Sequence, residues 1–580
     1  MGFSPRAMVQ RPRPESQGNR ALLVLVDSRG SYTDTSIVDQ TVLVALQHFG
    51  FPFRIHDLAA GPLTRDLLAH CAAVVIAQAR LGDALSLEET ELLASGVEEA
   101  GLGLVNFDGE LRLYKPPLLR LLGLEADRIP MASDLLRIGG NDHFINRTQQ
   151  AGSLVRLKRP VTIAQIKRVG RHVVELAQAA MGKDQLIFSR HNVPGTAYEP
   201  DQFPAVLAGV CGRGRAVQFA CSLRIWHPEF LGHAMGLDAF FWRAIVWAAR
   251  KPFVAQMMPP YVTIRVDDGR GRHDFRYTGV MNRHGYRPMV SCFLDLVPEE
   301  VVPFMRDRAG QVDWDAHAFD YYRLIPFDFG IGEYSDTELK EIFERVDRWY
   351  DERGLRPPRR AVFHWGEVGV RVLPYLKARG RTFVYSTYHL GQVKWERLFP
   401  NWWPYGLNSL FYDYVPEDPE MYNIGAMLPR HLVAPDVLTG CTTWAGDNPT
   451  NDMVKAADRA ASSVRLALDS GFFSEITTHE QKFGVLTLEE IDRWLSLLSQ
   501  QTDRYDIRGV SHDEAAEYTR ARDESWIAAA STPDGRAVCL RLGGKASVSL
   551  ELALFENDGD GVVQRWESVP AFEEEVRVNL

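Results

Sequence analysis

Hydrophobic and polar positions in the first hundred residues alternate between short apolar runs and amphipathic segments. The run ALLVLVD at 21–27 predicts a buried strand, and DQTVLVALQHFG at 39–50 predicts an amphipathic helix that ends at a glycine. Further strands are expected at PFRIHDL, AAVVIAQ and GLGLVNFDG, with a helix at about 87–100 before the last of them. Strand and helix in turn predict a parallel sheet covered by helices on both faces.

The pattern changes between about 125 and 205, where short alternating stretches such as SLVRLKRPVTIAQI predict a mainly β insertion. After it, GRGRAVQFACSLRI predicts a glycine turn and a strand, and LDAFFWRAIVWAARKPF predicts a helix. We therefore interpret residues 21–256 as one doubly wound α/β domain with this insertion. The preceding residues 1–20 are rich in Pro, Arg, Gln and Ser and are expected to be a disordered tail.

A second series of βα units follows the Pro-Pro pair at 259–260. Its strands are expected at YVTIRV, RPMVSCFLDL, RAVFHWG, RTFVYST and FFSEITTH. Its helices are expected at SDTELKEIFERVDRWYDERG, VGVRVLPYLKARG, NDMVKAADRAASSVRLALDSG and TLEEIDRWLSLLSQ. Repeated units of this kind predict a complete or distorted (β/α) barrel over 257–520. Alternating strands such as RAVCLRLGG predict a small β domain over 521–580.

Composition narrows the class of protein. The chain has 580 residues, a modest net charge of −10 and no basic or acidic block, so we expect several domains and no nucleic-acid partner. The six cysteines are scattered without a CxxC pair, as in proteins of a reducing compartment. The first apolar run ends at Asp27, which predicts neither a signal peptide nor a membrane span. These features favour a cytoplasmic location, and they leave the oligomeric state open.

Two adjacent carboxylates end the strand YVTIRV. Asp267 and Asp268 are followed by Gly269, and the carboxyl ends of strands are where active sites form in (β/α) barrels. One carboxylate can bind a divalent metal while the other acts as a general base on water. From these residues alone, an ordinary Asp-Asp-Gly turn remains the alternative.

The stretch VTIRVDDG resembles the first motif of the polysaccharide deacetylase family, which are carbohydrate esterases with a distorted βα barrel. The resemblance implies that Asp267 is the general base and Asp268 a metal ligand. WDAHAFDYYR supplies His317 at the first position of the family's His-x-x-x-His motif, but Tyr321 stands at the second. FFSEITTHE resembles the closing motif, which implies that His479 is the general acid.

The metal shell that this resemblance implies needs a second histidine, because Tyr321 does not supply one. Where the family usually carries Arg-x-Pro-Tyr-Gly, this chain has FHWGE, and we predict His364 from that stretch as the third ligand. His389 in STYHLGQ is the alternative. The expected cofactor is a divalent cation, with zinc as the ion that such a ligand set favours.

An aromatic stretch, PNWWPYGLNSLFYDY, contains Trp402 and Trp403. Sugar rings stack on aromatic faces, so these residues are candidates for binding substrate. The alternative is a loop packed by its own aromatic side chains. The further candidates for substrate contacts are Tyr321, Trp365 and Glu367.

The segment GRGRAVQFA…WRAIVWAARKPF and the strand order of the first domain resemble the class I glutamine-amidotransferase-like fold. An active member would carry a cysteine at a sharp turn after a strand. Here that position reads Gln78-Ala79-Arg80, and Cys71 lies before the strand. We therefore expect a non-catalytic domain and a buried, structural Cys71.

Together, these observations predict a metal-dependent hydrolase that removes N-acetyl groups from an amino sugar or its polymer. Two alternatives remain. The same fold could hydrolyse a C–N bond in a small non-sugar amide, or the chain could be a non-catalytic carbohydrate-binding protein.

Overall fold

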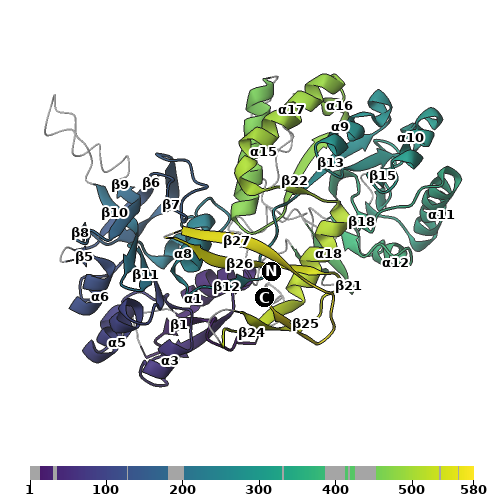
Figure 1. Cartoon of the computed structure of the whole chain (residues 1–580). Helices are drawn as coiled ribbons and strands as arrows, with labels where there is room; N and C mark the ends of the chain where they lie inside the picture. Colours follow the sequence, from purple (N-terminus) through teal and green to yellow (C-terminus); the bar gives the residue numbers. More distant parts are fainter. Residues whose placement is uncertain are drawn as a thin grey trace, which may run out of the picture. The chain divides into compact units, whose positions relative to one another are not determined.

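The computed structural model describes residues 14–29, 35–126, 129–180, 202–328, 332–366, 368–385, 412–415, 418–424, 452–533, 537–559 and 561–580. They divide into two compact units. The catalytic candidates belong to the unit formed by the described residues of 258–523, and the described residues of 14–257 form the other unit together with those of 524–580. Figure 1 labels many of the helices and strands of both.

The unit that contains residues 14–257 has a large mixed sheet. Parallel strands run in the order β2-β1-β3-β4-β11. Their bounds are Phe53–Asp57, Leu22–Val26, Ala73–Ile76, Gly103–Asn106 and Gly214–Phe219. The sheet continues in antiparallel order through β10 (Gln202–Cys211), β9 (Val173–Ala180), β6 (Met131–Ile138) and β7 (Leu154–Ile163). The β-rich insertion therefore extends the parallel sheet instead of forming a layer of its own.

Helices cover both faces of the parallel strands. On one face, Leu68 of α3 (Arg65–Ala69), Leu93 of α5 (Leu87–Glu98) and Leu118 of α6 (Pro116–Leu122) pack into one apolar cluster with residues of β1, β3 and β4. On the other face lies α8 (Asp238–Ala248), whose Phe241 ring stacks on Phe107 with 5.1 Å between centroids. Successive residues of these strands point to opposite faces of the sheet, and helices cover both faces. The sequences of the strands are therefore nearly continuous apolar runs.

The remaining helical segments of this unit are short. They are α1 (Thr35–Val38), η1 (Asp39–Leu43), α2 (Val44–His48), α4 (Leu81–Ala84) and η2 (Leu223–Trp226). A separate short pair joins β5 (Leu124–Glu125) to β8 (Lys167–Arg168).

The C-terminal strands belong to the same unit. β26 (Leu550–Asp558) pairs with β12 (Phe253–Ala255) on one side and with β27 (Gly561–Val569) on the other. A further sheet joins β24 (Ser525–Ser531), β25 (Cys539–Gly544) and β28 (Glu575–Asn579). We predicted a separate β domain at 521–580, but residues 524–580 complete the unit of the N-terminal residues, because β12 finds its hydrogen-bonding partner there.

The strands of residues 258–523 form two larger sheets. The first is parallel, in the order β15-β14-β13-β22, with β23 beside β13. Their bounds are Asp313–Ala318, Met289–Phe293, Tyr261–Gly269, Ser474–His479 and Arg508–Gly509. The second runs β18-β19-β21-β20, with bounds Arg360–Ala361, Phe383–Val384, Asp418–Ile424 and Tyr412–Val415. A short hairpin joins β16 (Phe327–Asp328) to β17 (Gly332–Glu333).

No backbone ladder joins the two larger sheets in the part of the chain that the structure describes. The complete or distorted (β/α) barrel therefore remains a prediction. Side chains make the connection between β15 and the segment after β18. The Val362 amide donates to Oδ2 of Asp315 at 2.8 Å, and the Val362 carbonyl accepts a hydrogen bond from Nδ1 of His317, also at 2.8 Å. The first strand of the second sheet is thereby held against the last strand of the first.

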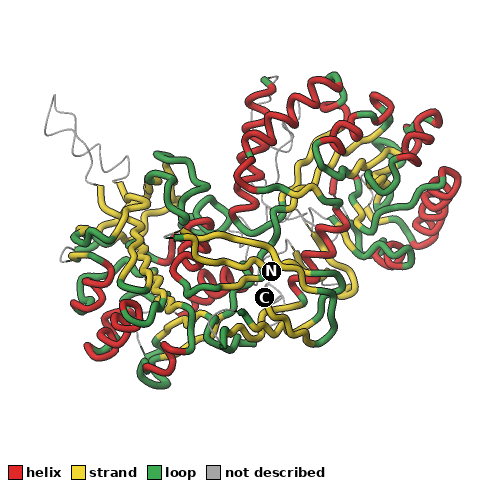
Figure 2. Tube along the Cα trace, in the orientation of Figure 1, coloured by secondary structure: helices red, strands yellow, loops and turns green. Residues whose placement is uncertain are grey.

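Helices pack outside these strands, red around yellow in Figure 2. The main ones are α9 (Tyr277–Arg283), α10 (Val302–Asp307), α11 (Asp336–Arg353), α12 (Leu373–Lys377), α15 (Met453–Asp469), α17 (Leu488–Gln501) and α18 (His512–Asp523). The shorter segments are η3 (Arg272–Phe275), η4 (Leu294–Leu296), η5 (Glu299–Val301), η6 (His364–Gly366), α16 (Glu480–Phe483) and η7 (Asp503–Tyr505). One apolar core joins the strands to α9, α10, α11, α12, α15 and α17.

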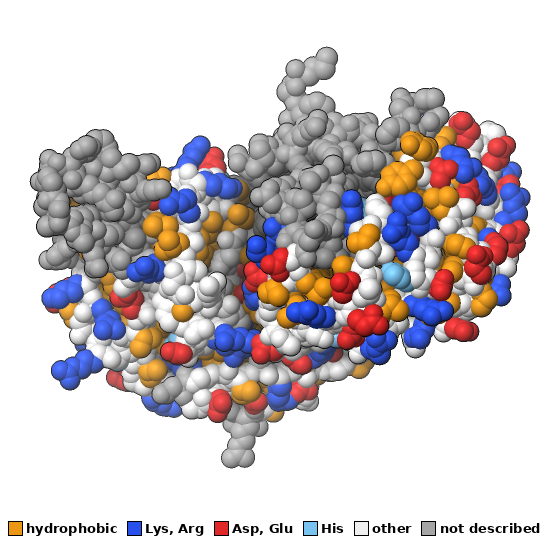
Figure 3. All heavy atoms as spheres, turned by 90° about the horizontal axis from the view of Figure 1, so that it is seen from above, with side chains coloured by type: hydrophobic (Ala, Val, Ile, Leu, Met, Phe, Trp, Pro, Cys, Tyr) orange, Lys and Arg blue, Asp and Glu red, His pale blue; other side chains and the backbone are white. Residues whose placement is uncertain are grey.

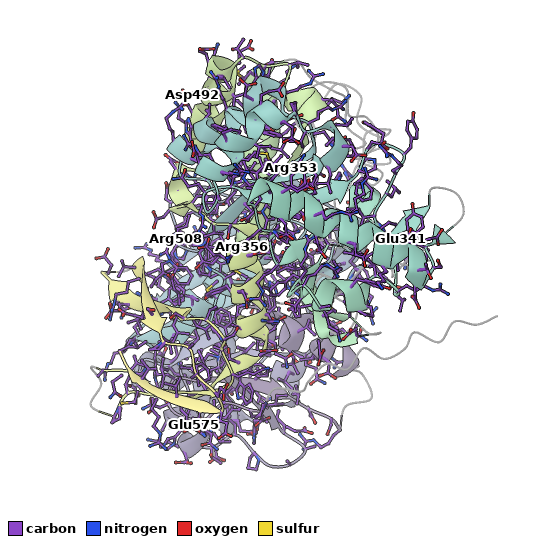
Figure 4. The ribbon with its side chains drawn as sticks, turned by 90° about the vertical axis from the view of Figure 1, so that its right-hand side faces the viewer. Glu341, Arg353, Arg356, Asp492, Arg508 and Glu575 are labelled. Carbon is purple, nitrogen blue, oxygen red and sulfur yellow. The ribbon has the colours of Figure 1, made fainter. Side chains whose placement is uncertain are left out.

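Local signals explain where α11 begins and which face it buries. A capping box between Ser335 and Glu338 satisfies the first backbone amides of the helix. Its apolar side chains recur at helical spacing and pack into the core. Glu341 and Arg353 are labelled on this helix in Figure 4, and the Arg353 guanidinium lies 4.7 Å from the Trp349 ring centroid.

Candidate metal centre

The Asp-Asp-Gly sequence ends β13 where its pairing with β14 is irregular. The register passes from Val266 directly to Gly269, so Asp267 and Asp268 lie in a bulge. Asp268 has a left-handed backbone with φ of 60°, which is uncommon for a residue other than glycine. Side chains alternate in a regular strand, so consecutive aspartates would point to opposite faces. The bulge redirects Asp268 toward the interior, where Asp267 also lies.

A second bulge carries His317. In the pairing of β14 with β15, the register passes from Ala316 to Ala318, which leaves His317 as the extra residue. His317 is 3% exposed, and its Nδ1 donates to the Val362 carbonyl. The other ring nitrogen, Nε2, therefore faces the interior as a lone-pair donor. The motif order in the sequence predicts this histidine as a ligand but does not predict the strand β15 that carries it.

His364 comes from the segment after β18. We expected it at the end of a strand; the strand is short, and His364 instead begins η6. Its ring lies edge-on to that of His317, with 5.0 Å between centroids. His364 is 6% exposed.

These three side chains converge on one point. Oδ1 of Asp268 lies 3.3 Å from Nδ1 of His364 and 3.6 Å from Nε2 of His317. The three ligand atoms all lie within 4.8 Å of one another. Tetrahedral zinc at about 2.05 Å from each ligand would hold them about 3.3 Å apart, so the spacing suits such an ion.

The chemistry of these donors also fits a cation. Oδ1 of Asp268 is buried and accepts no well-aligned hydrogen bond from the described residues. One carboxylate oxygen and two imidazole nitrogens are ligands that zinc accepts. Among the described residues this is the one cluster of histidine, cysteine or acidic side chains with metal-ligand spacing.

The electrostatics keep Asp268 and His317 in the forms that bind metal. Burial raises the pKa of Asp268, but the close polar contact with His364 and the electrostatic influence of His317 and His479 outweigh burial and lower that pKa. Burial is also the main cause that lowers the pKa of His317 to about 4. At neutral pH, Asp268 is therefore ionised and the His317 imidazole is neutral.

Asp267 lies beside the cluster, in a buried charge network. Nε of Arg265 is 3.1 Å from Oδ1 of Asp267, and Nη1 of Arg265 is 3.3 Å from Oε1 of Glu475. Arg360 donates to the other oxygen of Glu475 at 2.8 Å. Burial raises the pKa of Glu475, but the guanidinium of Arg360 and then that of Arg265 hold it well below its usual range. Positive and negative side chains therefore alternate along this chain of contacts.

His479 ends β22 in direct register with Asp267 on β13. The next residue, Glu480, is buried and binds the turn that follows the two aspartates. It accepts hydrogen bonds from the backbone amides of Arg270 (2.7 Å) and Arg272 (3.2 Å) and from the Tyr277 hydroxyl (2.9 Å). The segment that holds His479 therefore also fixes the backbone beside Asp268.

Tyr321 lies at the edge of the cluster and is 37% exposed. Its hydroxyl lies 3.4 Å from Oδ2 of Asp268, and Nε2 of Gln481 donates to the same oxygen at 2.7 Å. The other predicted site residues cannot be placed. His389, Glu367, Trp402 and Trp403 lie outside the described residues, as does the side chain of Trp365.

Sequence reasoning missed Arg265, Glu475 and Gln481. Arg265 stands two residues before Asp267, so strand alternation alone places both on the same face. Glu475 stands four residues before His479 on β22 and obeys the same rule. No local signal marks Gln481, because its role depends on α16 packing beside the end of β13.

No protein-family model and no curated protein matches the sequence. Among solved structures, a protein from Mycobacterium smegmatis assigned as a polysaccharide deacetylase is 11% identical, covers 47% of this chain and 94% of its own, and has a TM-score of 0.33. The chitin deacetylase of Colletotrichum lindemuthianum is 10% identical, with coverages of 45% and 89% and a TM-score of 0.27.

A β-galactosidase from Rahnella sp. R3 is 14% identical, covers 39% of this chain and 31% of its own, and has a TM-score of 0.24. The match thus spans less than a third of that relative's length. At TM-scores this low, the similarities add no weight beyond the geometry of the site.

None of the described helices has both the length and the apolar character needed to cross a bilayer. On the face drawn in Figure 3, acidic and basic side chains are interspersed over the described surface.

Proposed function

We propose that the unit of residues 258–523 is a metal-dependent hydrolase that removes N-acetyl groups from an amino sugar or an amino-sugar polymer. The observation that carries this proposal is the convergence of Asp268, His317 and His364 beside a second carboxylate, Asp267. His479 lies in register with Asp267 across β13 and β22. A ligand set, a base and an acid are therefore gathered at the carboxyl ends of neighbouring parallel strands.

Asp268, His317 and His364 would hold the cation. A bound divalent cation, with zinc as the expected ion, would lower the pKa of a water molecule and polarise an acetyl carbonyl. The Val362 carbonyl orients the His317 ring, and such partners set which imidazole nitrogen is available to a metal.

Asp267 accepts the proton of the attacking water at its carboxylate. The Arg265 guanidinium at 3.1 Å orients this carboxylate and balances its charge. His479 donates a proton to the nitrogen of the leaving amine, so that the C–N bond breaks and acetate and a free amine are released.

The test combines metal analysis with a product assay on the full-length protein. We expect one equivalent of divalent metal and release of acetate from N-acetylglucosamine oligomers. In D267N, which keeps the shape of the side chain but removes the base, we expect acetate release to fall by roughly 10²–10⁴-fold with the metal retained.

Unchanged turnover in D267N would refute the role of Asp267. A wild-type protein that binds metal but releases acetate from small non-sugar amides would favour the alternative substrate class. A protein that binds no metal would favour a carbohydrate-binding role.

We also infer that the unit containing residues 14–257 has no amidotransferase activity. Arg80 occupies the turn after β3, with a left-handed φ of 63°, where an active member of the resembled fold would carry its cysteine. Cys71 is fully buried, and burial raises the pKa of its thiol to about 12. We therefore expect no glutamine hydrolysis and no alkylation of Cys71 by iodoacetamide in the folded protein, as mapped by mass spectrometry.

A further inference from the structure

The two carboxylate oxygens of Asp268 face different groups. Oδ1 faces the imidazole nitrogens of His364 and His317 at 3.3 and 3.6 Å. Oδ2 accepts a hydrogen bond from Nε2 of Gln481 at 2.7 Å, and the Tyr321 hydroxyl lies 3.4 Å from it. One oxygen is thus directed to the cation position, and the other is held by neutral side chains.

Gln481 is well suited to hold this oxygen. It lies in α16, two residues after His479, and is half-buried. Its Nε2 is also 3.1 Å from the Tyr321 hydroxyl oxygen. A side-chain amide carries two N–H groups, so one nitrogen can donate to the carboxylate and to the hydroxyl together.

The backbone at Asp268 makes such support necessary. A left-handed φ at a residue other than glycine persists only where the surroundings impose it. Glu480 binds the backbone amides of Arg270 and Arg272. Gln481, the next residue, binds the Asp268 side chain, so one short segment restrains both the turn and the carboxylate.

We propose that Gln481 is a positioning residue that, together with Tyr321, keeps Asp268 a one-oxygen ligand of the cation. The inference rests on the proposed metal centre and deepens it. A carboxylate with both oxygens available can rotate, or can bind the cation through both oxygens. When Gln481 and Tyr321 hold Oδ2, Oδ1 is the oxygen that Asp268 offers to the cation. Tyr321 takes this supporting role at the position where a His-x-x-x-His motif would place a ligand.

The test measures metal binding without relying on turnover. Metal-free wild type, Q481M, Q481A and Y321F would be titrated with Zn²⁺ in competition with a chromophoric chelator, and with Co²⁺ by absorption spectroscopy. We expect both Gln481 variants to raise the Zn²⁺ dissociation constant by roughly 10–100-fold. We also expect them to change the visible spectrum of bound Co²⁺, because Oδ2 becomes free to coordinate.

Y321F should weaken Zn²⁺ binding less than the Gln481 variants, because the hydroxyl of Tyr321 lies farther from Oδ2 of Asp268 than Nε2 of Gln481 does. The matched control is Q501M, at the last residue of α17 and also half-buried, which should bind both metals as the wild type does. Melting temperatures of the metal-free proteins identify a variant that fails to fold, and the second Gln481 variant then carries the test.

The outcomes separate this inference from the proposed reaction. Equal Zn²⁺ affinity and equal Co²⁺ spectra in wild type and Gln481 variants would overturn the role of Gln481. A wild type that binds no metal would overturn both proposals. Weakened binding in the variants, with no acetate released by the wild type from any substrate, would support the role of Gln481 and refute deacetylation.

Discussion

Arg265 lies between two carboxylates in the interior of the unit that holds the candidate metal centre. It contacts Asp267 at 3.1 Å and Glu475 at 3.3 Å, and it is 5% exposed. Its guanidinium carbon also lies 4.1 Å from the Tyr385 ring centroid. Removal of this one cation would take a guanidinium away from two buried carboxylates, and Glu475 would keep its contact with Arg360.

We therefore expect R265M to lower the free energy of unfolding by about 3–5 kcal/mol, the usual cost of breaking a buried ion pair. Denaturant unfolding of wild type and variant measures the difference. The control is R276M, whose exposed side chain pairs with Asp274 on the surface and which should change stability by less than about 0.5 kcal/mol. Equal effects of the two substitutions would contradict this account.

The carboxyl group of Asp313, at the start of β15, should make the free energy of unfolding depend on pH. Burial, and next the Asp513 carboxylate, raise its pKa to about 7, and its Oδ2 accepts no hydrogen bond from the described residues. The folded protein therefore prefers the protonated form. This preference leaves stability intact below the ordinary pKa near 4 and reduces it as the pH rises toward 7.

Asparagine resembles the protonated form, so D313N should be more stable than wild type at pH 8, by at most about 4 kcal/mol. The difference should shrink toward pH 4. Chemical unfolding at pH 5 and pH 8 measures it. D307N, at the exposed end of α10, is the control and should show the same small difference at both pH values. A D313N variant less stable than wild type at pH 8 would refute the assignment.

At the scale of elements, the segment His479 to Gln481 joins the end of β22 to the turn after β13. Glu480 is buried and accepts hydrogen bonds from two backbone amides and one tyrosine hydroxyl. Hydrogen bonds to an ionised acceptor contribute more than neutral ones. This contact orders the turn that carries Asp268.

We expect E480Q to destabilise the fold by about 1–3 kcal/mol, because the amide cannot accept all three hydrogen bonds. It should also reduce metal affinity, since the turn that carries Asp268 loosens. Thermal unfolding and zinc titration measure both effects. E489Q, on the exposed first turn of α17, is the control, and an E480Q protein indistinguishable from it would contradict this account.

At the scale of the whole molecule, the proposed metal centre would draw its ligands from β13, β15 and the segment after β18, which are far apart in sequence. A cation bound by all of them binds only the folded form. It therefore stabilises that form by mass action, by about 2.7 kcal/mol when free metal is one hundred times the dissociation constant.

Removal of metal with a chelator should thus lower the melting temperature of the full-length protein, and added Zn²⁺ should restore it. Calorimetry measures the shift. Asp268→Asn, which removes the charged ligand, should abolish the difference between metal-bound and metal-free samples. A melting temperature that does not respond to Zn²⁺ in wild type would exclude a metal shared by these strands.

The sequence by itself determined the elements whose signals are local. Helical spacing predicted α11, and motif order gave Asp267, Asp268, His317 and His479 as candidate site residues. These predictions depend only on periodicity and on neighbours within a few residues. The mainly β insertion was also recognised, although not its place in the large sheet.

Only the tertiary structure decided which of these elements became neighbours. Periodicity indicates which side of a strand is buried but not what packs against it, so β12 with β26, Arg265 with Glu475 and Gln481 with Asp268 were not predictable. The two bulges are a further case, because irregular pairing redirects Asp268 and His317 against simple alternation. The residues proposed for the chemistry could be named from the sequence, whereas their orientation and support come from contacts between segments far apart in the chain.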